Sequence, residues 1–377
     1  MRILLLVLTL LISSGSFSQD ISHLRISLLT CSPGEELYST FGHSGLRVTD
    51  TTTHTDVVFN YGTFDYYDPG FYSKFVKGKL EYYLEADPFL DFVYAYQMDG
   101  RTVVEQELDL TAGEKIRLYH ALRENAKPEN KYYRYDFLFD NCATRIRDIV
   151  KVNSDNLQFP ELLPVNTVTF RHLIYEYLDN NKAWWSKLGI DILLGAGMDK
   201  YANSDQSMFL PDYLYRGFDS ATVNRRALVT KRNAIFTPVL SAAAGSSIFT
   251  PSLTFGILLL LFVLLSFLHK TGILKVLDFL LFLSAGLLGI LLIVMWTATD
   301  HQLCASNYNL LWAIPLHVFA AFTIFSKRTL PAYWKACTIV YALLIVLWAV
   351  LPQNMNEALI PLVILLGWRS WVQGRKK

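Results

Sequence analysis

Two short motifs in the N-terminal half of the chain carry residue types that can perform chemistry together. The first places His43 between glycines at the start of an expected strand, and the second places Cys142 directly after Asp140 and Asn141, either of which can cap a helix. A cysteine in the first turn of a helix lies near the positive end of the helix dipole and near free amide donors, so its pKa falls and the thiolate is favoured. A thiolate that faces a histidine is the arrangement of thiol enzymes. We therefore predict Cys142 as the nucleophile and His43 as the group that shuttles its proton.

A third polar group has to orient the imidazole ring, and Asn60 is the candidate. It lies on the expected strand that follows the strand of His43, and an antiparallel neighbour can place its side chain beside the ring. Tyr38 is predicted to donate a hydrogen bond in the site, and Arg145 to hold a lipid phosphate. Each residue also has a structural alternative, which is a turn or strand end for Asn60, aromatic packing for Tyr38 and an ion pair for Arg145.

The cysteine has an alternative of its own. Cys31 and Cys142 are the only two cysteines before the apolar C-terminal part, and both face an oxidising compartment if this part of the chain is exported. A Cys31–Cys142 disulfide, with His43 merely packed under a strand, would make the protein non-catalytic. The context of a helix start and the matching histidine favour the nucleophile, because a bridge needs neither.

These residues have to be positioned by an α+β domain. Alternating or β-branched segments predict strands at residues 24–29, 45–48, 57–61, 79–84 and 102–110. Periodic apolar residues predict helices at residues 112–126, 141–150, 168–185 and 188–200. We expect the helix of Cys142 to pack across an antiparallel sheet that carries His43.

The ends of the chain predict export and membrane insertion. Residues 1–18 read as a signal peptide, with a basic start, a short apolar stretch and small residues before the cleavage point. Hydrophobic residues make up 52% of the chain and charged residues only 18%, and the apolar residues concentrate after residue 252. We predict a soluble domain over residues 19–235 and a transmembrane domain over residues 252–372. The expected spans, about five in number, are residues 252–268, 276–296, 309–325, 336–351 and 358–372.

The charges between the spans predict their orientation. Basic residues follow the first, third and fifth spans, whereas residues 297–308 and 352–357 contain no lysine or arginine. This alternation places the basic loops and the C-terminus in the cytoplasm of a bacterium and the N-terminal domain in the periplasm, on a multi-pass inner-membrane protein. His301 and Asn307 of the outer loop at 297–308 are candidates for contact with lipid headgroups, and the alternative is a solvated hairpin.

Several classes of function lack their signature here. A net charge of +1 and the absence of a basic stripe interleaved with aromatic residues argue against a nucleic-acid partner. We expect no metal and no cofactor, because the sequence contains no paired cysteines, no histidine pair at ligand spacing and no glycine-rich phosphate loop.

The order of a strand histidine, a polar residue on the next strand and Asn-Cys at a helix start resembles the permuted papain-like superfamily, which includes lecithin:retinol acyltransferase and permuted NlpC-type enzymes. The whole chain is more similar still to the Lnb lipoprotein N-acyltransferase family of Bacteroides. The resemblance rests on the segments 32–48, 60–65, 75–82, 140–142 and 209–211, and on 300–301 and 307–312 in the C-terminal part.

The resemblance implies an acyltransferase that works through thiol catalysis. A phospholipid would donate a fatty acyl chain to Cys142, and the N-terminal amine of a diacylglyceryl-cysteine lipoprotein would accept it from the thioester. The expected partners are therefore a phospholipid, a lipoprotein and the surrounding membrane lipids. Two alternatives remain, a membrane-tethered papain-like peptidase or amidase of the cell envelope and a non-catalytic lipid-binding envelope protein.

Overall fold

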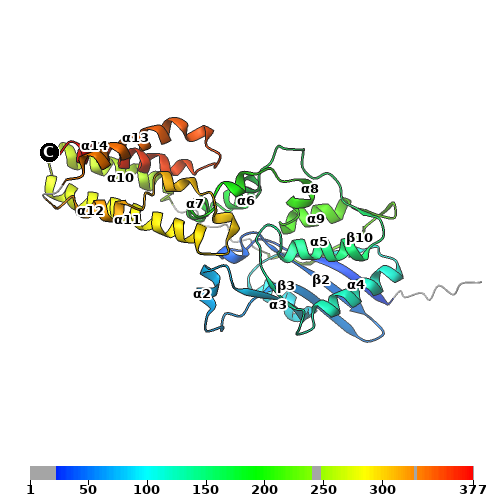
Figure 1. The fold of residues 1–377 in the computed structure, drawn as a ribbon. Helices are drawn as coiled ribbons and strands as arrows, with labels where there is room; N and C mark the ends of the chain where they lie inside the picture. Colours follow the sequence, from blue (N-terminus) through cyan, green and yellow to red (C-terminus); the bar gives the residue numbers. More distant parts are fainter. Residues whose placement is uncertain (1–22, 240–247, 327–328, 377) are drawn as a thin grey trace, which may run out of the picture.

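The computed structural model describes residues 23–239, 248–326 and 329–376, so the predicted signal peptide at 1–18 lies outside the described residues. The chain forms two parts that lie end to end, a sheet covered by helices and an elongated group of helices from the C-terminal part (Figure 1). The first part contains the two chemical motifs, and the second contains the predicted spans.

The first part is built on an antiparallel sheet of seven strands in the order β10-β5-β1-β2-β3-β4-β6. The strands are β1 (Leu24–Cys31), β2 (His43–Asp50), β3 (Thr55–Thr63), β4 (Glu81–Pro88), β5 (Val103–Leu108), β6 (Tyr132–Arg134) and β10 (Val229–Phe236). The first five confirm the predicted strands to within a few residues. The edge strands β6 and β10 were not predicted, since β6 has only three residues and β10 exposes a polar run.

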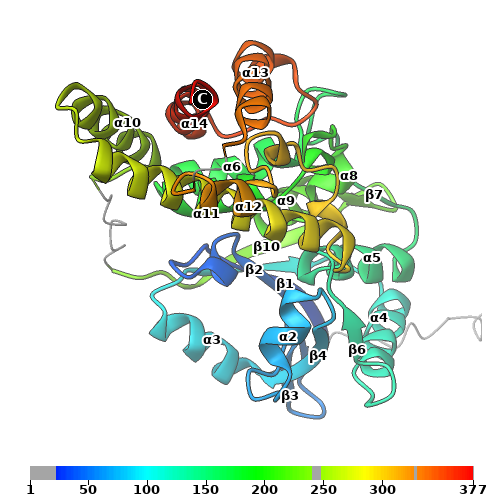
Figure 2. The same cartoon turned by 60° about the vertical axis from the view of Figure 1, so that its left-hand side comes forward.

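Both faces of the sheet are covered, because buried apolar side chains lie on each of them. The helices α4 (Ala112–Asn125), α5 (Cys142–Asn153) and α9 (Pro211–Ser220) pack on the face of Ile26 and Leu46. The helix α3 (Phe89–Met98) packs on the opposite face, against Leu29 and Val58. Figure 2 shows α3 on one side of the strands and α4 and α5 on the other.

In the helical extension after α5, the helices begin and end at other residues than predicted. The predicted helices at 168–185 and 188–200 are in fact α6 (Phe170–Asn180) and α7 (Trp184–Leu193), followed by a short 3₁₀ turn at Ala196–Asp199. Lys182 adopts φ 51°, a left-handed conformation that ends α6 and separates it from α7.

Four of the five predicted spans are helices. They are α10 (Pro251–Phe267), α11 (Thr271–Thr297), α13 (Pro331–Leu347) and α14 (Ile360–Gly374). Within the described ranges, α11 and the continuous stretch Pro331–Val350 are long and apolar enough to cross a membrane, and α10 is a shorter apolar helix. The C-terminal part is therefore helical and contains candidate membrane helices.

The third predicted span, residues 309–325, is not a continuous helix. It consists of a 3₁₀ turn at Tyr308–Leu311, a turn through Pro315 and the short helix α12 (His317–Phe322), and many of its backbone hydrogen bonds join residues three apart. A 3₁₀ conformation rises about 2.0 Å per residue, so the segment still covers a long distance. Gly286 and Gly289 of α11 let it approach closely, because a Cβ at Gly289 would lie 2.0 Å from the Ala313 carbonyl oxygen.

The last predicted span carries an arginine, and the structure shows why this is tolerated. Arg369 on α14 forms a buried two-pronged ion pair with Asp278 on α11, with nitrogen–oxygen distances of 2.7 and 2.8 Å. The Gln373 amide also donates to Asp278 over 2.6 Å. A buried charge within a membrane helix is usually paired in this way.

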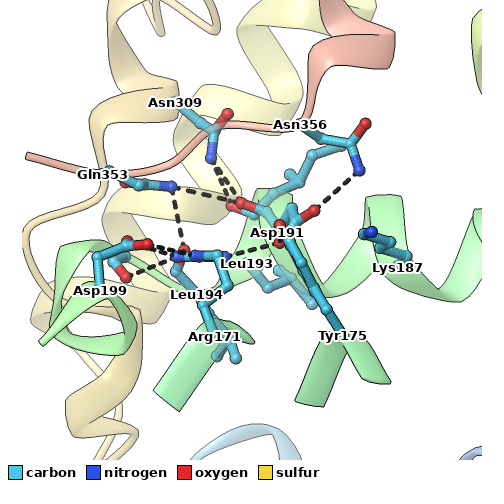
Figure 3. Close-up of polar contacts among 12 residues, drawn as sticks. Arg171, Tyr175, Lys187, Asp191, Leu193, Leu194, Asp199, Asn309, Gln353 and Asn356 are labelled. Carbon is cyan, nitrogen blue, oxygen red and sulfur yellow. Dashed lines mark hydrogen bonds and ion pairs between the residues drawn. The ribbon is translucent and has the colours of Figure 1, made fainter. Parts of the chain in front are cut away.

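The two parts are joined by a polar cluster at the end of α7 (Figure 3). Asp191, whose side chain is fully buried, accepts hydrogen bonds from Arg171, Tyr175 and Asn356. Asn309 and Gln353, from two loops of the C-terminal part, donate to backbone carbonyls at the end of α7, which a helix end leaves without partners. Through Asp191 and these carbonyls, the junction fixes the sheet domain relative to the membrane helices.

We predict that Asp191→Ala destabilises the protein strongly. The substitution leaves Arg171, Tyr175 and Asn356 with unmet hydrogen-bonding capacity, and breaking a buried ion pair costs about 3–5 kcal/mol. The measurement is the midpoint of thermal unfolding of the purified protein in detergent.

Asp179→Ala is the matched control for this prediction. Asp179 lies on the neighbouring helix α6 and pairs with Lys187 while 43% of its side chain is exposed, so its loss should cost no more than about 1 kcal/mol. Equal midpoints for the two variants would contradict a structural role of the junction.

Candidate active site

Cys142 is the first residue of α5, and the start of this helix is fixed by a reciprocal pair of hydrogen bonds. The Thr144 backbone N–H donates to the Asn141 side chain over 2.9 Å, and the Asn141 backbone N–H donates to the Thr144 hydroxyl over 2.8 Å. The Asn141 amide also donates to the carbonyls of Phe137 and Phe209, which ties the helix start to two other segments. The predicted Asn cap is therefore present, and it holds Cys142 at the positive end of the helix.

His43 is the first residue of β2, opposite Cys31 on β1. The chain enters β2 through Gly42, which has φ 81° and lies so close to β1 that a Cβ would be 2.8 Å from the Cys31 carbonyl oxygen. Only glycine fits both conditions. Gly42 therefore sets the direction in which the chain enters β2 at His43.

Asn60 on β3 orients the His43 ring. The Asn60 Oδ1 atom lies 2.7 Å from His43 Nε2, and the Asn60 Nδ2 group donates to Asp87 on β4 over 3.2 Å. Because Asp87 accepts from Nδ2, Oδ1 is the atom that faces the imidazole, and Nε2 must carry the hydrogen. The other ring nitrogen, Nδ1, is then left to exchange a proton with a nucleophile.

Cys142 and His43 lie beside the same glycine, Gly62, and influence each other's charge. Burial raises the pKa of Cys142, but the charge and the polar interaction of His43 and the backbone N–H groups of Ser44 and Ala143 together lower it below the ordinary thiol value. Burial lowers the pKa of His43, but the charge and the polar interaction of Cys142 and the hydrogen bond with Asn60 raise it above the ordinary imidazole value. Both shifts favour a thiolate beside an imidazolium.

The space around the pair is shaped by residues that the sequence did not single out as site residues. Gly62 has φ 97°, and a Cβ there would lie 3.7 Å from Cys142 Cβ and 3.8 Å from His43 Cε1. The Tyr96 ring from α3 stacks with the His43 ring at a centroid distance of 6.3 Å and an interplanar angle of 16°. Gly62 follows Asn60 by two residues. Its place in the motif of Asn60 was therefore the sequence feature that could have indicated its role.

A cavity of about 330 Å³ adjoins Asn60 on the α3 side of the sheet. Its lining includes Tyr38, Asp87, Asp91 and Arg101. Arg101 is buried and donates from Nε to the Ser32 carbonyl over 2.8 Å, while its Nη2 atom has no partner among the described residues. Tyr38 thus lies beside the orienting residue, and its role in substrate binding stays a prediction.

The other predicted substrate contacts lie away from the pair or are already engaged. Arg145 forms a two-pronged ion pair with Asp140 and lies 3.6 Å above the Tyr133 ring, which is the structural alternative given for it. His301 Nε2 lies 3.0 Å from the Phe75 carbonyl oxygen, at the contact between the two parts of the chain.

The structure contradicts the prediction that Asn307 contacts lipid headgroups. It is buried, and its amide donates to the carbonyls of Ile192 and Leu193 over 2.8 and 3.1 Å. The side chain therefore helps to close the end of α7 and does not face lipid headgroups.

Cys31 and Cys142 are both free thiols in the structure. Burial raises the pKa of Cys31 to about 12, so Cys31 stays a neutral thiol, whereas the pKa of Cys142 is lowered by His43. The two cysteines therefore have opposite chemical character. Within the described ranges, no cluster of histidine, cysteine and acidic side chains could hold a metal ion.

We predict that Cys142 is alkylated by iodoacetamide at a lower pH than an ordinary thiol, whose pKa is about 8.5. In His43→Ala the lowering contribution of His43 is lost and burial remains, so the pKa should rise above the ordinary value. We expect the midpoint of the rate–pH profile to move to higher pH. The measurement is the alkylation rate of Cys142 against pH, followed by mass spectrometry of the modified peptide.

Asn60→Ala is the graded control, because it keeps the imidazole and removes only one of its hydrogen bonds. Its midpoint should lie between those of the wild-type protein and His43→Ala. An unchanged midpoint in His43→Ala would show that His43 does not set the ionisation of Cys142.

Comparison with family models assigns both parts of the chain to one family. The model of the Lnb N-terminal periplasmic domain matches residues 17–176, and the model of the Lnb transmembrane domain matches residues 243–376. Neither the curated proteins nor the solved structures contain a significant match to this chain. With its periplasmic domain and its transmembrane domain both matched, the chain belongs to the Lnb family.

Proposed function

We propose that this protein is a lipoprotein N-acyltransferase. It moves a fatty acyl chain from a phospholipid through a thioester on Cys142 to the N-terminal amine of a diacylglyceryl-cysteine lipoprotein. The observation that carries the proposal is the Cys142–His43–Asn60 arrangement, in which Asn60 is hydrogen-bonded to His43, and His43 and Cys142 lie beside the same glycine, Gly62, and shift each other's pKa. A periplasmic domain attached to a transmembrane domain suits two substrates that are both membrane lipids.

In the first half of the reaction, the Cys142 thiolate attacks the ester carbonyl carbon of the phospholipid. The tetrahedral intermediate collapses to a thioester, and the imidazolium of His43 gives its proton to the departing lysophospholipid alkoxide. Asn60 keeps the ring aligned for this transfer, because it holds Nε2–H throughout.

In the second half, the lipoprotein amine attacks the thioester carbonyl carbon. His43, now neutral, removes a proton from the amine, and the Cys142 thiolate leaves as the amide forms. The oxyanion of each intermediate is held by the Cys142 backbone N–H at the helix start and by a second donor. Ser44 and Tyr133 are candidates for that donor, since their buried hydroxyls have no partner among the described residues.

A permuted papain-like fold for the periplasmic domain is part of the proposal. The support is the chain order, in which the strands of His43 and Asn60 precede the helix of Cys142, and the packing of that helix against β2 and β3. The sheet supplies the base and the orienting group, and the helix supplies the nucleophile.

We predict that Cys142→Ser and His43→Ala abolish acyl transfer while the protein remains folded and inserted. A serine hydroxyl without thiol acidity is a far poorer nucleophile, and without His43 no base remains beside it. Asn60→Ala should lose less, about one to two orders of magnitude, since the nucleophile and base survive. The measurement uses labelled phospholipid and mass spectrometry of lipoprotein N-termini from cells with and without each variant.

The covalent intermediate gives the decisive control. Wild-type protein should carry a hydroxylamine-sensitive acyl group on Cys142, and Cys31→Ser should still form it, because Cys31 is a separate neutral thiol. Full activity in Cys142→Ser would rule out the thioester. An acylated Cys142 that passes its acyl group to water or to a peptide instead of a lipoprotein would favour a hydrolase or amidase.

We also propose a multi-pass inner-membrane orientation with the C-terminus in the cytoplasm. Reporter fusions after residue 232 and within residues 297–308 should read as periplasmic, and a fusion at the C-terminus should read as cytoplasmic, as the basic loops require. A periplasmic C-terminus would mean four or six spans and would contradict the assignment of five.

A further inference from the structure

The segment between β3 and β4 exposes an unusual set of large apolar side chains. It contains the short helix α2 (Phe71–Val76), and no residue of this helix is buried. We name the part at residues 66–76 the aromatic segment. Its exposed members are Tyr66, Tyr67, Tyr72, Phe75 and Val76, with Tyr67 93% and Tyr72 82% exposed. Such a cluster on a protein surface normally marks an interaction site.

The structure places the aromatic segment beside the C-terminal end of α11, which is the outer end in the proposed orientation. The Asp300 backbone N–H donates to the Lys77 carbonyl over 2.9 Å, and His301 Nε2 lies 3.0 Å from the Phe75 carbonyl oxygen. Arg134 adds an ion pair with Asp300. Figure 1 shows α2 below the end of α11 that is nearer to the sheet domain.

The depth of the aromatic segment relative to the bilayer follows from the positions of the charged residues on α11. Asp278 is the last charged residue of the helix, and the uncharged stretch from 279 to 297 follows it. At about 1.5 Å per residue this stretch matches the ~30 Å hydrocarbon core of a bilayer. Asp300 and His301 then lie in the outer headgroup layer, and so does the segment that is bonded to them.

We propose that the aromatic segment inserts its exposed side chains into the outer leaflet of the bilayer, beside α11. The lipid-facing surface of α11 is continuous with it, since Ile293, Val294 and Trp296 are also exposed. Tyrosine and tryptophan are the residues enriched at this depth, because their rings are apolar at one end and polar at the other. The occupant of the surface is therefore phospholipid.

A row of aromatic rings leads from the aromatic segment to the active site. The Phe64 ring contacts Tyr66 and Tyr82 at centroid distances of 4.7 and 5.3 Å, and Tyr82 stacks with Tyr135 at 4.4 Å. Tyr135 lies next to Gly62, and Cys142 and His43 lie next to the same glycine. That an acyl chain follows this row to Cys142 rests on the proposed function.

The test measures insertion independently of activity. In the full-length Cys142→Ser protein, Tyr72→Cys is labelled with an environment-sensitive fluorophore, and the other cysteines are buried. The protein is placed in vesicles of phosphatidylcholine and phosphatidylglycerol that contain a phospholipid with a nitroxide near its headgroup. Thr52→Cys, on the exposed turn between β2 and β3, is the matched control.

We expect blue-shifted emission and strong nitroxide quenching at position 72, at least about twofold above position 52. Equal emission and equal quenching at the two positions would overturn the proposal. A second arm compares Tyr67→Ser/Tyr72→Ser with wild type, and acylation of Cys142 from bilayer phospholipid should fall roughly tenfold while acylation from a monomeric short-chain phospholipid is unchanged.

The two arms separate the two proposals. Quenching at position 72 without any acylation of the wild-type protein would support the membrane contact and refute the acyltransferase. Acylation that falls equally for bilayer and monomeric phospholipid would refute the role of the aromatic segment in lipid access.

Discussion

The chemistry that we propose for this protein depends on keeping a negative charge on a buried sulfur atom. Burial alone would keep Cys142 protonated, as it does for Cys31 on the adjacent strand. The charge is stabilised because three elements meet at one point, the start of α5, the strand end of His43 and the strand of Asn60. The Asn141 cap, the left-handed Gly42 and the acceptor Asp87 each fix one of these elements. Each of these contacts supports the position of Cys142 or of His43, and His43 makes the largest contribution that lowers the pKa of the thiol.

The second constraint is the position of the sheet domain relative to the membrane. The polar cluster around Asp191 and the contact between α2 and the loop after α11 are two separate attachments between the parts of the chain. Two attachments define an orientation, whereas one would leave a hinge. The candidate active site is thereby held at a constant angle to the helices of the C-terminal part, which suits the proposed use of substrates from the bilayer.

Local patterns in the sequence predicted the elements that carry the chemistry. The strands of His43 and Asn60 alternate clearly, and the cap signal before Cys142 is specific, so the contact between His43 and Asn60 followed from their placement on neighbouring strands. The sequence did not predict β10, because its pairing with β5 joins residues more than a hundred positions apart. The burial of Asn307 and the pairing of Asp278 with Arg369 were hidden for the same reason, since long-range contacts leave no local periodicity.

The irregular third segment of the C-terminal part has a consequence for how the protein is made. A continuous helix makes its backbone hydrogen bonds within itself, so it can pass from the insertion machinery into lipid without a partner. A segment with turns leaves some backbone groups without such bonds and cannot do this. Here the segment lies against Gly286 and Gly289 of α11, and His317 is hydrogen-bonded to Tyr333 and Tyr341 of α13. Its neighbours on both sides must therefore be present before it is stable in the bilayer. In the proposed topology the segment therefore has to wait for α13 during synthesis, so that α11, the segment and α13 would enter the membrane as one cooperative unit.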